Sequence, residues 1–303
     1  MAVPAVGEGT KAAGPGGESA GGASGHVAAH PGWREVPVRH WDGAALPGPL
    51  PGILVERTEC VAEEAPIALY YNGQPHVVML GTPLDVEDFA LGFTVSEAIV
   101  GAVAEIAGVA VTPLPEGLEV RIEIPPERAA LLETRRRNLS GRGGCGMCGT
   151  ERLQQALRAP RPVAAGPLVA AAALHAALCQ IRALQAINAR TGAVHAAAWA
   201  LPSGEVRWLR EDVGRHNALD KLIGALLAAG QAPAAGFAIV TSRASYELVQ
   251  KAATVGIGLL AAISAPTTLA IRLAEDTGLT LVAFARDGRH GIYTHPQRLC
   301  HGA

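Results

Sequence analysis

Short apolar runs alternate with segments of helical periodicity through the second half of the chain. The apolar runs cover residues 194–200, 206–209, 237–241, 258–263 and 279–285, and the helical segments cover 168–189, 216–229, 245–254 and 267–277. Strands separated by helices are typical of sheets with parallel strands, because a parallel connection needs a long crossover. The pattern predicts an α/β domain over residues 166–303.

The preceding region, residues 32–165, is predicted to form a β-rich domain, so that the whole chain is α+β. Two apolar runs, at 67–71 and 76–80, flank an Asn-Gly pair, which suits the positive φ angles of a two-residue hairpin turn. A helix is expected after Asp85, which can cap it. The alternation of apolar and polar residues over 118–124 predicts a half-buried strand.

Gly, Ala, Ser and Pro dominate residues 1–31, which contain no aromatic residue, Leu or Ile. Such a segment cannot bury enough apolar surface to offset the entropy lost on ordering, so we predict a disordered leader. A second stretch rich in Pro and Gly, at 160–167, is expected to separate the two domains, with the boundary between residues 165 and 166.

The charge balance argues against a protein that coats nucleic acid. The chain has 25 Lys and Arg against 27 Asp and Glu, a net charge of −2, whereas such proteins are usually basic. Its five cysteines are an odd number at scattered positions, which does not predict a disulfide framework. No secretion signal is recognised, and the longest uncharged run, 252–271, contains Gly and Pro residues that disfavour a membrane span. We expect a cytoplasmic protein with free thiols.

The sharpest local signal is a pair of cysteines at C-x-x-C spacing among four glycines. Cys145 and Cys148 lie within residues 143–149, and four arginines precede them at 135–137 and 142. Nearby cations favour the thiolate, which is the nucleophilic form of cysteine. Glycines leave the sulfur atoms with little side-chain cover. The segment therefore predicts reactive thiols.

From the residues alone, several chemical roles of this pair stay open. A zinc site needs two further ligands, and Cys300-His301 is the one candidate pair. A thioredoxin-like dithiol normally lies between a strand and a helix, which the glycines fit poorly. A persulfide or acyl carrier needs one reactive thiol with the second as a helper. Two small buried residues in a turn are the unreactive alternative.

Polar turns follow three of the predicted strands. The first holds Arg215, His216 and Asn217 at a helix start, the second holds Ser242 and Arg243, and the third covers residues 286–290. Free N–H groups at helix N-termini attract anions, and ligands of open α/β sheets bind beyond the carboxyl ends of strands. Three such turns in one α/β domain predict a pocket for a polyanionic ligand. Salt-bridged or N-capped surface turns are the alternative for each turn taken alone.

A single histidine and two isolated cysteines are the remaining candidates for metal ligands or reactive groups. His195 lies in a predicted strand, where a single histidine is more often part of the core or of a pocket wall than a metal ligand. Cys60 and Cys179 have no local partners and are interpreted as packing residues. We therefore predict no resident metal site.

An ordered series of motifs resembles the FdhD family of formate dehydrogenase accessory sulfurtransferases over about residues 50–298. In chain order the motifs are Gly81-Thr82-Pro83, Ala90-Leu91-Gly92-Phe93 with Glu97, Cys145-Gly146-Met147-Cys148-Gly149, residues 191–197, residues 211–221, Ser242-Arg243-Ala244-Ser245-Tyr246-Glu247 with Gln250-Lys251, Ser264-Ala265-Pro266-Thr267, Phe284-Ala285-Arg286 and Tyr293-Thr294. Each motif is weak alone, and their order makes the set specific.

The resemblance implies a cytoplasmic sulfur carrier, a sulfurtransferase that takes persulfide sulfur from a cysteine desulfurase. The family passes this sulfur to the molybdenum (or tungsten) bis(molybdopterin guanine dinucleotide) cofactor, bis-MGD, which is then supplied to a formate dehydrogenase. In the family the first cysteine of the pair carries the persulfide, which is Cys145 here, and Cys148 assists. The family's cofactor-contact stretch falls on Phe284, Ala285, Arg286, Asp287, Gly288 and Arg289.

The resemblance also implies a homodimer and a C-terminal half with the cytidine-deaminase fold but without zinc. We add the hypothesis that Arg215, His216 and Asn217, with Ser242 and Arg243, hold one guanine-dinucleotide arm, because they stand before helix N-termini. The rival functions are a chaperone that binds the molybdenum cofactor without moving sulfur, and a structural zinc module.

Overall fold

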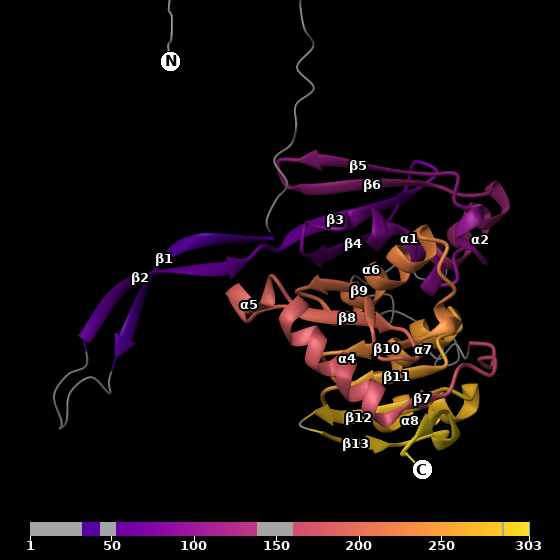
Figure 1. Ribbon diagram of the computed structural model, residues 1–303. Helices are drawn as coiled ribbons and strands as arrows, with labels where there is room; N and C mark the ends of the chain where they lie inside the picture. The colour runs from indigo at the N-terminus through magenta and orange to yellow at the C-terminus, as the bar shows by residue number, and fades with distance from the viewer. Residues whose placement is uncertain (1–31, 43–52, 138–159, 287, 303) are drawn as a thin grey trace, which may run out of the picture.

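The computed structural model describes residues 32–42, 53–137, 160–286 and 288–302. It is a mixed α/β protein with two principal sheets, which confirms the expected class (Figure 1). The predicted leader lies outside the described residues. Within them no helix is long and apolar enough to cross a membrane.

The larger sheet has six strands in the order β13-β12-β11-β10-β8-β9. Its strands are β8 (His195–Ala200), β9 (Val206–Asp212), β10 (Phe237–Val240), β11 (Leu259–Ala262), β12 (Thr280–Arg286) and β13 (Arg289–Ile292). β10, β11 and β12 are parallel to one another, whereas β8, β9 and β13 are each antiparallel to a neighbour. The predicted parallel strands thus form the centre of a mixed sheet.

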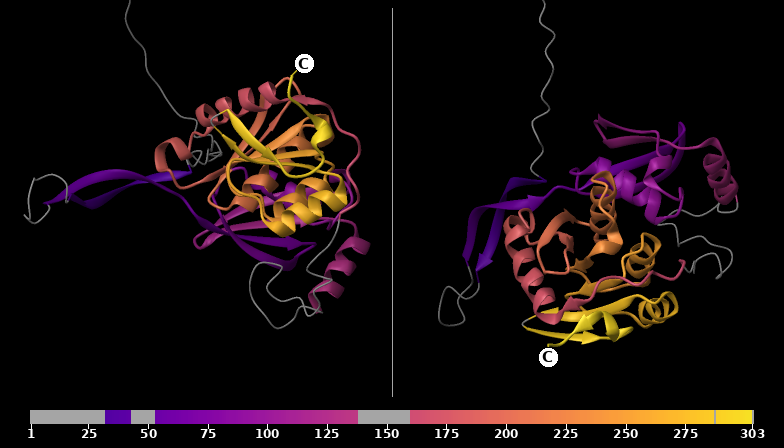
Figure 2. Two further views of the ribbon diagram at one scale, coloured as in Figure 1. Left: turned by 90° about the horizontal axis from the view of Figure 1, so that it is seen from below. Right: turned by 45° about the vertical axis from the view of Figure 1, so that its right-hand side comes forward.

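Helices cover both faces of this sheet (Figure 2). α4 (Ala171–Leu184) packs on one face, and α6 (Arg215–Ala228), α7 (Tyr246–Thr254) and α8 (Thr268–Thr277) pack on the other. A strand that is covered on both faces has no face toward solvent, so its side chains can all be apolar. This explains why β10 and β11 are apolar along their whole length and buried at every residue.

The smaller sheet has four strands in the order β4-β3-β6-β5, with one face against α1. Its elements are β3 (Ala65–Tyr71), β4 (Gln74–Gly81), α1 (Val86–Ser96), β5 (Gly108–Leu114) and β6 (Gly117–Glu123), and α2 (Pro126–Arg137) follows. The predicted hairpin is confirmed, because Asn72 and Gly73 take φ angles of 48° and 77° between β3 and β4. The strand expected at 118–124 is β6.

Two glycines bring the two parts of the molecule into close contact. α1 and α6 cross so tightly that a Cβ atom added at Gly92 would lie 1.7 Å from the Asp220 carbonyl oxygen. A Cβ atom added at Gly224 would lie 1.8 Å from the Asp88 carbonyl oxygen. Only glycine permits this approach of two helix backbones.

The remaining elements are short or stand apart. β1 (Trp33–Asp42) and β2 (Ile53–Ala62) form an antiparallel ribbon that extends away from both sheets in Figure 1. β7 (Val169–Ala170) pairs with β14 (Leu299–Cys300), and single 3₁₀ turns cover Val103–Glu105, Pro233–Ala235 and Pro296–Arg298. The domain boundary at 165/166 and the likeness to the cytidine-deaminase fold stay predictions.

Two local predictions were wrong. Asp85 takes a left-handed conformation, with φ of 50°, and its side chain does not cap α1. The single helix predicted over 168–189 is instead α4, which ends at Leu184, followed by α5 (Asn188–Thr191). The break arises because the buried Glu211 carboxylate accepts the N–H groups of Ile187 and Asn188, both at 2.9 Å, and starts a new helix there.

Candidate functional site

The pairing of strands brings all three predicted polar turns to one edge of the six-stranded sheet. The parallel strands β10, β11 and β12 all end at this edge. β8 runs antiparallel to β10, so its first residue, His195, lies at this same edge. β9 ends there too, because its last residue, Asp212, pairs with His195. In Figure 1 this is the end of the sheet nearest α5. We call it the polar edge.

Backbone hydrogen bonds connect neighbouring turns along the polar edge. The Thr241 N–H donates to the Ala196 carbonyl at 3.0 Å, and the Ser264 N–H donates to the Ser242 carbonyl at 3.4 Å. The Phe284 N–H in turn donates to the Ser264 carbonyl at 3.1 Å. The turns therefore form one continuous rim.

Arg215 and His216 form the first turn of α6 at this rim. His216 Nε2 lies 2.6 Å from the Glu247 carboxylate at the start of α7, and 3.4 Å from the Ser245 hydroxyl. The hydrogen bond from His216 lowers the pKa of Glu247, and partial burial opposes this effect. The Arg215 Nε atom is buried and has no hydrogen-bond partner among the described residues. Two adjacent helix starts thus carry a cation, an imidazole and a carboxylate.

His195 lies beside this pair and is half buried. Burial lowers its pKa, and the positive charge of Arg215 lowers it further. Both effects favour the neutral imidazole, which can act as a hydrogen-bond donor or acceptor. The sequence indicated the core or a pocket wall for this residue, and the structure places it at the polar edge.

Asn217 has a different environment from its two predecessors. Its side chain is buried, and its amide nitrogen donates to the Leu80 carbonyl at 2.8 Å and to Asp212 Oδ1 at 3.0 Å. Both amide hydrogens are used inside the protein. Asn217 holds the turn against β4, and its contact with a cofactor stays a prediction.

The second turn presents one buried and one exposed side chain. Ser242 is buried, and its hydroxyl donates to the Arg243 carbonyl at 3.0 Å, so it does not cap a helix. Ser245 is the N-cap residue of α7 but makes no side-chain capping bond. The Arg243 side chain is exposed and available to a ligand.

The third turn combines backbone strain with exposure. Phe284 has a φ angle of 50°, although it is not glycine, and its ring is 43% exposed. The register between β12 and β13 shifts between Ala283 and Arg286. Strained conformations concentrate at functional sites. Ala285 is fully buried, Arg286, Gly288 and Arg289 are exposed, and Asp287 lies outside the described residues.

Comparison with known proteins fits this arrangement of motifs and turns. The profile of the FdhD/NarQ family matches residues 62–300. The chain belongs to the FdhD/NarQ family. A sulfur carrier protein FdhD from Xanthomonas euvesicatoria is 57% identical over 241 residues, which cover 80% of this chain and 86% of that protein. The sulfur carrier protein FdhD of Cupriavidus necator is 50% identical over 252 residues, which cover 83% and 88%.

A solved structure shares the fold of this FdhD/NarQ chain. It comes from Desulfotalea psychrophila and is provisionally described as a formate dehydrogenase accessory protein. The match has a TM-score of 0.69 at 23% identity and covers 88% of this chain and 99% of that one. At this identity the match supports the fold alone.

The predicted thiol pair of the FdhD/NarQ chain, Cys145 and Cys148, lies outside the described residues. On either side of it, α2 ends at Arg137, and the Val163 N–H donates to the Thr277 carbonyl at 2.8 Å. Thr277 ends α8 just before β12 begins, at the edge of the sheet opposite the polar edge. Cys179 is exposed on α4, which corrects its interpretation as a packing residue.

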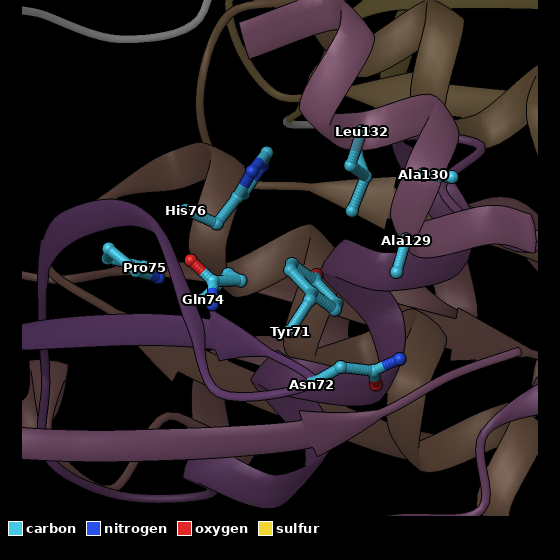
Figure 3. Close-up of a pocket in the computed structure, with 8 residues that line it drawn as sticks. All are labelled: Tyr71, Asn72, Gln74, Pro75, His76, Ala129, Ala130 and Leu132. Atoms are coloured by element: carbon cyan, nitrogen blue, oxygen red, sulfur yellow. The ribbon is translucent and has the colours of Figure 1, made fainter. Parts of the chain in front are cut away.

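A cavity of about 330 Å³ lies between the β3–β4 turn and α2 (Figure 3). Its lining is Tyr71, Asn72, Gln74, Pro75, His76, Ala129, Ala130 and Leu132. None of the predicted site residues is among them. The Tyr71 hydroxyl is hydrogen-bonded to the Thr94 hydroxyl at 2.8 Å, so the aromatic wall is fixed.

Sequence reasoning missed Glu247 and Thr82 as parts of this neighbourhood. Glu247 forms an ion pair with His216, which lies 31 positions earlier in the sequence. Thr82 comes from the four-stranded part and bonds to the residues just before α6. Both stand in quoted family motifs, but their partners are set by tertiary structure. Among the described residues, no cluster of three His, Cys, Asp or Glu could hold a metal ion.

Proposed function

We propose that this chain is a sulfurtransferase of the sulfur-carrier type that supports a formate dehydrogenase. Cys145 takes persulfide sulfur from a cysteine desulfurase and passes it to the metal of bis-MGD. The proposal is carried by the 57% identity, over 80% of the chain, to a protein named sulfur carrier protein FdhD. It includes a cytoplasmic location and a homodimer.

In the first step the Cys145 thiolate attacks the outer sulfur of the persulfide on the desulfurase. A new S–S bond forms on Cys145, the old S–S bond breaks, and the desulfurase cysteine leaves as a thiolate. The four upstream arginines favour the Cys145 thiolate.

In the second step the Cys148 thiolate attacks the inner sulfur, that of Cys145 itself. The Cys145–Cys148 disulfide forms, and the outer sulfur leaves as sulfide, which binds the metal of the cargo. A dithiol reductant then reduces the disulfide for the next cycle. His216 is the proposed group for moving the accompanying proton, because it lies at the polar edge and its imidazole is held by Glu247 through Nε2.

The polar edge is the proposed seat of the cargo. Two guanine dinucleotides carry several phosphate charges, and Arg215, Arg243, Arg286 and Arg289 bring four guanidinium groups to the rim of one sheet. Guanidinium groups bind phosphates through paired hydrogen bonds. The exposed Phe284 ring offers a face on which a base can stack. Arg243→Ala is expected to weaken binding of bis-MGD, and unchanged affinity would count against this seat.

Intact mass spectrometry tests the sulfur step directly. The purified chain is incubated with a cysteine desulfurase and cysteine, beside Cys145→Ala, Cys148→Ala and the control Cys179→Ala, which removes an exposed cysteine of α4. We expect a reducible gain of about 32 Da, one persulfide sulfur, in every protein except Cys145→Ala. If the mass gain is lost in Cys148→Ala alone, Cys148 is the sulfur carrier and Cys145 the assisting cysteine.

The rival chaperone, which binds the cofactor without moving sulfur, predicts a different result. In that case no protein gains sulfur, and Cys145→Ala still delivers a cofactor that supports dehydrogenase activity. A sulfur carrier instead leaves the dehydrogenase present but inactive when Cys145 is replaced. Zinc content of the purified protein tests the structural zinc module.

A further inference from the structure

All three polar groups of Thr82 bond to the end of β9, to the turn that follows it or to α6. Its N–H donates to Asp212 Oδ2 at 3.0 Å, and its hydroxyl oxygen accepts the Val213 N–H at 3.2 Å. Its carbonyl oxygen accepts from Lys221 Nζ at 2.8 Å. Thr82 follows β4 in the four-stranded part, whereas its partners belong to the six-stranded part. One residue of the first part therefore fixes the β9–α6 turn of the second.

A buried ion pair completes these contacts. Lys221 Nζ lies 2.7 Å from Asp212 Oδ2, and both side chains are 0% exposed. Asp212 Oδ1 accepts the Gly214 N–H at 2.7 Å. A buried pair of charges tolerates little displacement, because each charge depends on its partner in place of water. We call Thr82, Asp212 and Lys221 the clamp.

The turn also packs closely against the end of β4. A Cβ atom added at Gly81 would lie 2.9 Å from Asn217 Nδ2, and one added at Gly214 would lie 2.9 Å from the same atom. Asn217 also bonds to β4 through the Leu80 carbonyl. Val213 and Gly214 stand directly before Arg215 and His216 in the chain. Their backbone position therefore sets where these two side chains begin.

We propose that Thr82, acting through Asp212 and Val213, is a positioning residue for Arg215 and His216 at the polar edge. The four-stranded part thus serves as the frame of the site. This inference rests on the proposed function in one respect, namely that Arg215 and His216 meet the anionic cargo. Thr82 itself touches no ligand.

The test compares two isosteric Thr→Val replacements in the full chain. Thr82→Val removes the acceptor of the Val213 N–H at the clamp. Thr277→Val removes an equally buried hydroxyl that donates to the Leu273 carbonyl of its own helix at 2.7 Å, away from the polar edge. Thr82→Ser keeps the hydroxyl and serves as the rescue variant.

Two readouts are measured for each protein well below its melting temperature. The first is the affinity for guanosine diphosphate, a fragment of one cofactor arm, by calorimetry. The second is the NMR titration of the His216 imidazole, assigned by its loss in His216→Gln. We expect Thr82→Val to bind guanosine diphosphate about tenfold more weakly and to shift the His216 titration. Thr82→Ser and Thr277→Val should match the wild type in both.

Equal behaviour of Thr82→Val and Thr277→Val in the His216 titration would overturn the inference. If the wild type does not bind guanosine diphosphate, the proposed seat of the cargo fails, and the titration still decides the positioning role. If Thr82→Val does not fold, hydrogen exchange of the wild type decides it. The clamp requires slow exchange at the Thr82, Val213 and Gly214 amides, and fast exchange there would reject it.

Discussion

At the scale of single residues, the lysines of this chain have a structural role. The sequence has three lysines, and the two in the described residues, Lys221 and Lys251, are both buried beside carboxylates. Lys251 Nζ lies 2.6 Å from Glu97 and 3.0 Å from Asp220. Burial lowers its pKa, but these carboxylates outweigh that effect, and the pKa of Lys251 is raised. Lysine serves here as a structural ion.

Lys251→Met should therefore destabilise the protein by about 3–5 kcal/mol, because Asp220 is left as an uncompensated buried charge. Urea unfolding at pH 7 measures the change. The control is Arg207→Gln, which removes an exposed pair with Glu205 and should cost less than about 1 kcal/mol. Similar losses in the two variants would contradict a structural role for the buried pair.

The ion pair of Glu247 with His216 predicts that the stability of the protein depends on pH. Its folded-state pKa is lowered, chiefly by the hydrogen bond from His216, so it contributes stability above its unfolded value of 4.5. That contribution is lost as the pH falls through the lower, folded-state pKa. Glu247→Gln should consequently be less stable than the wild type at pH 7, and the difference should shrink at acid pH. Urea midpoints measured across this range test it, and a constant difference would refute the assignment.

Residue-level prediction from sequence succeeded where a side chain's role is local and failed where it depends on distant partners. The turn that holds Arg215, His216 and Asn217 was predicted as part of a ligand site, with a salt-bridged turn as the alternative. The structure divides it. Arg215 and His216 lie at the polar edge, whereas Asp212, Asn217 and Lys221 bond to Thr82 or Leu80 of the other part of the molecule. No local pattern distinguishes these two sets, because the partners lie between 130 and 139 positions away in the sequence.

At the scale of elements, apolar runs predicted the central strands and helices to within a residue or two. β10, β12, α6 and α8 begin and end close to the predicted positions, because their buried faces follow the apolar residues of the sequence. β13 was missed because it is short and only one of its four residues, Ile292, is apolar. The break between α4 and α5 was missed because Glu211, which causes it, lies 24 positions from Ile187.

The crossing of α1 and α6 gives a prediction for an element. Gly92→Ala should raise helix propensity by about 1 kcal/mol, yet its Cβ atom would meet the Asp220 backbone at 1.7 Å. Overpacking of about 3 kcal/mol should dominate, for a net loss of about 2 kcal/mol in urea unfolding. The control is Gly108→Ala in β5, where a Cβ atom meets nothing within 4 Å. A neutral Gly92→Ala would mean that the two helices separate easily.

At the scale of the whole molecule, the two sheets are held as one unit by charges as well as by helix packing. Thr82 and Glu97 of the four-stranded part bond to Lys221 and Lys251 of the six-stranded part. Both contacts connect to the helices α6 and α7, whose first turns carry Arg215, His216 and Glu247. The polar edge therefore depends on a part of the chain that contributes none of its predicted ligand contacts.

This arrangement predicts that α1 and α6 unfold together. Each helix covers one sheet, and α1 cannot leave without breaking the Glu97–Lys251 ion pair and the Ser96–Asp220 hydrogen bond and opening its close crossing with α6. Hydrogen exchange at low denaturant should give the amides of α1 and α6 the same opening free energy. Lys251→Met should lower both values equally, whereas Arg207→Gln should leave them unchanged. If α1 opens independently at a lower free energy, the four-stranded part detaches while the polar edge stays folded. The polar edge would then not depend on the four-stranded part for its structure.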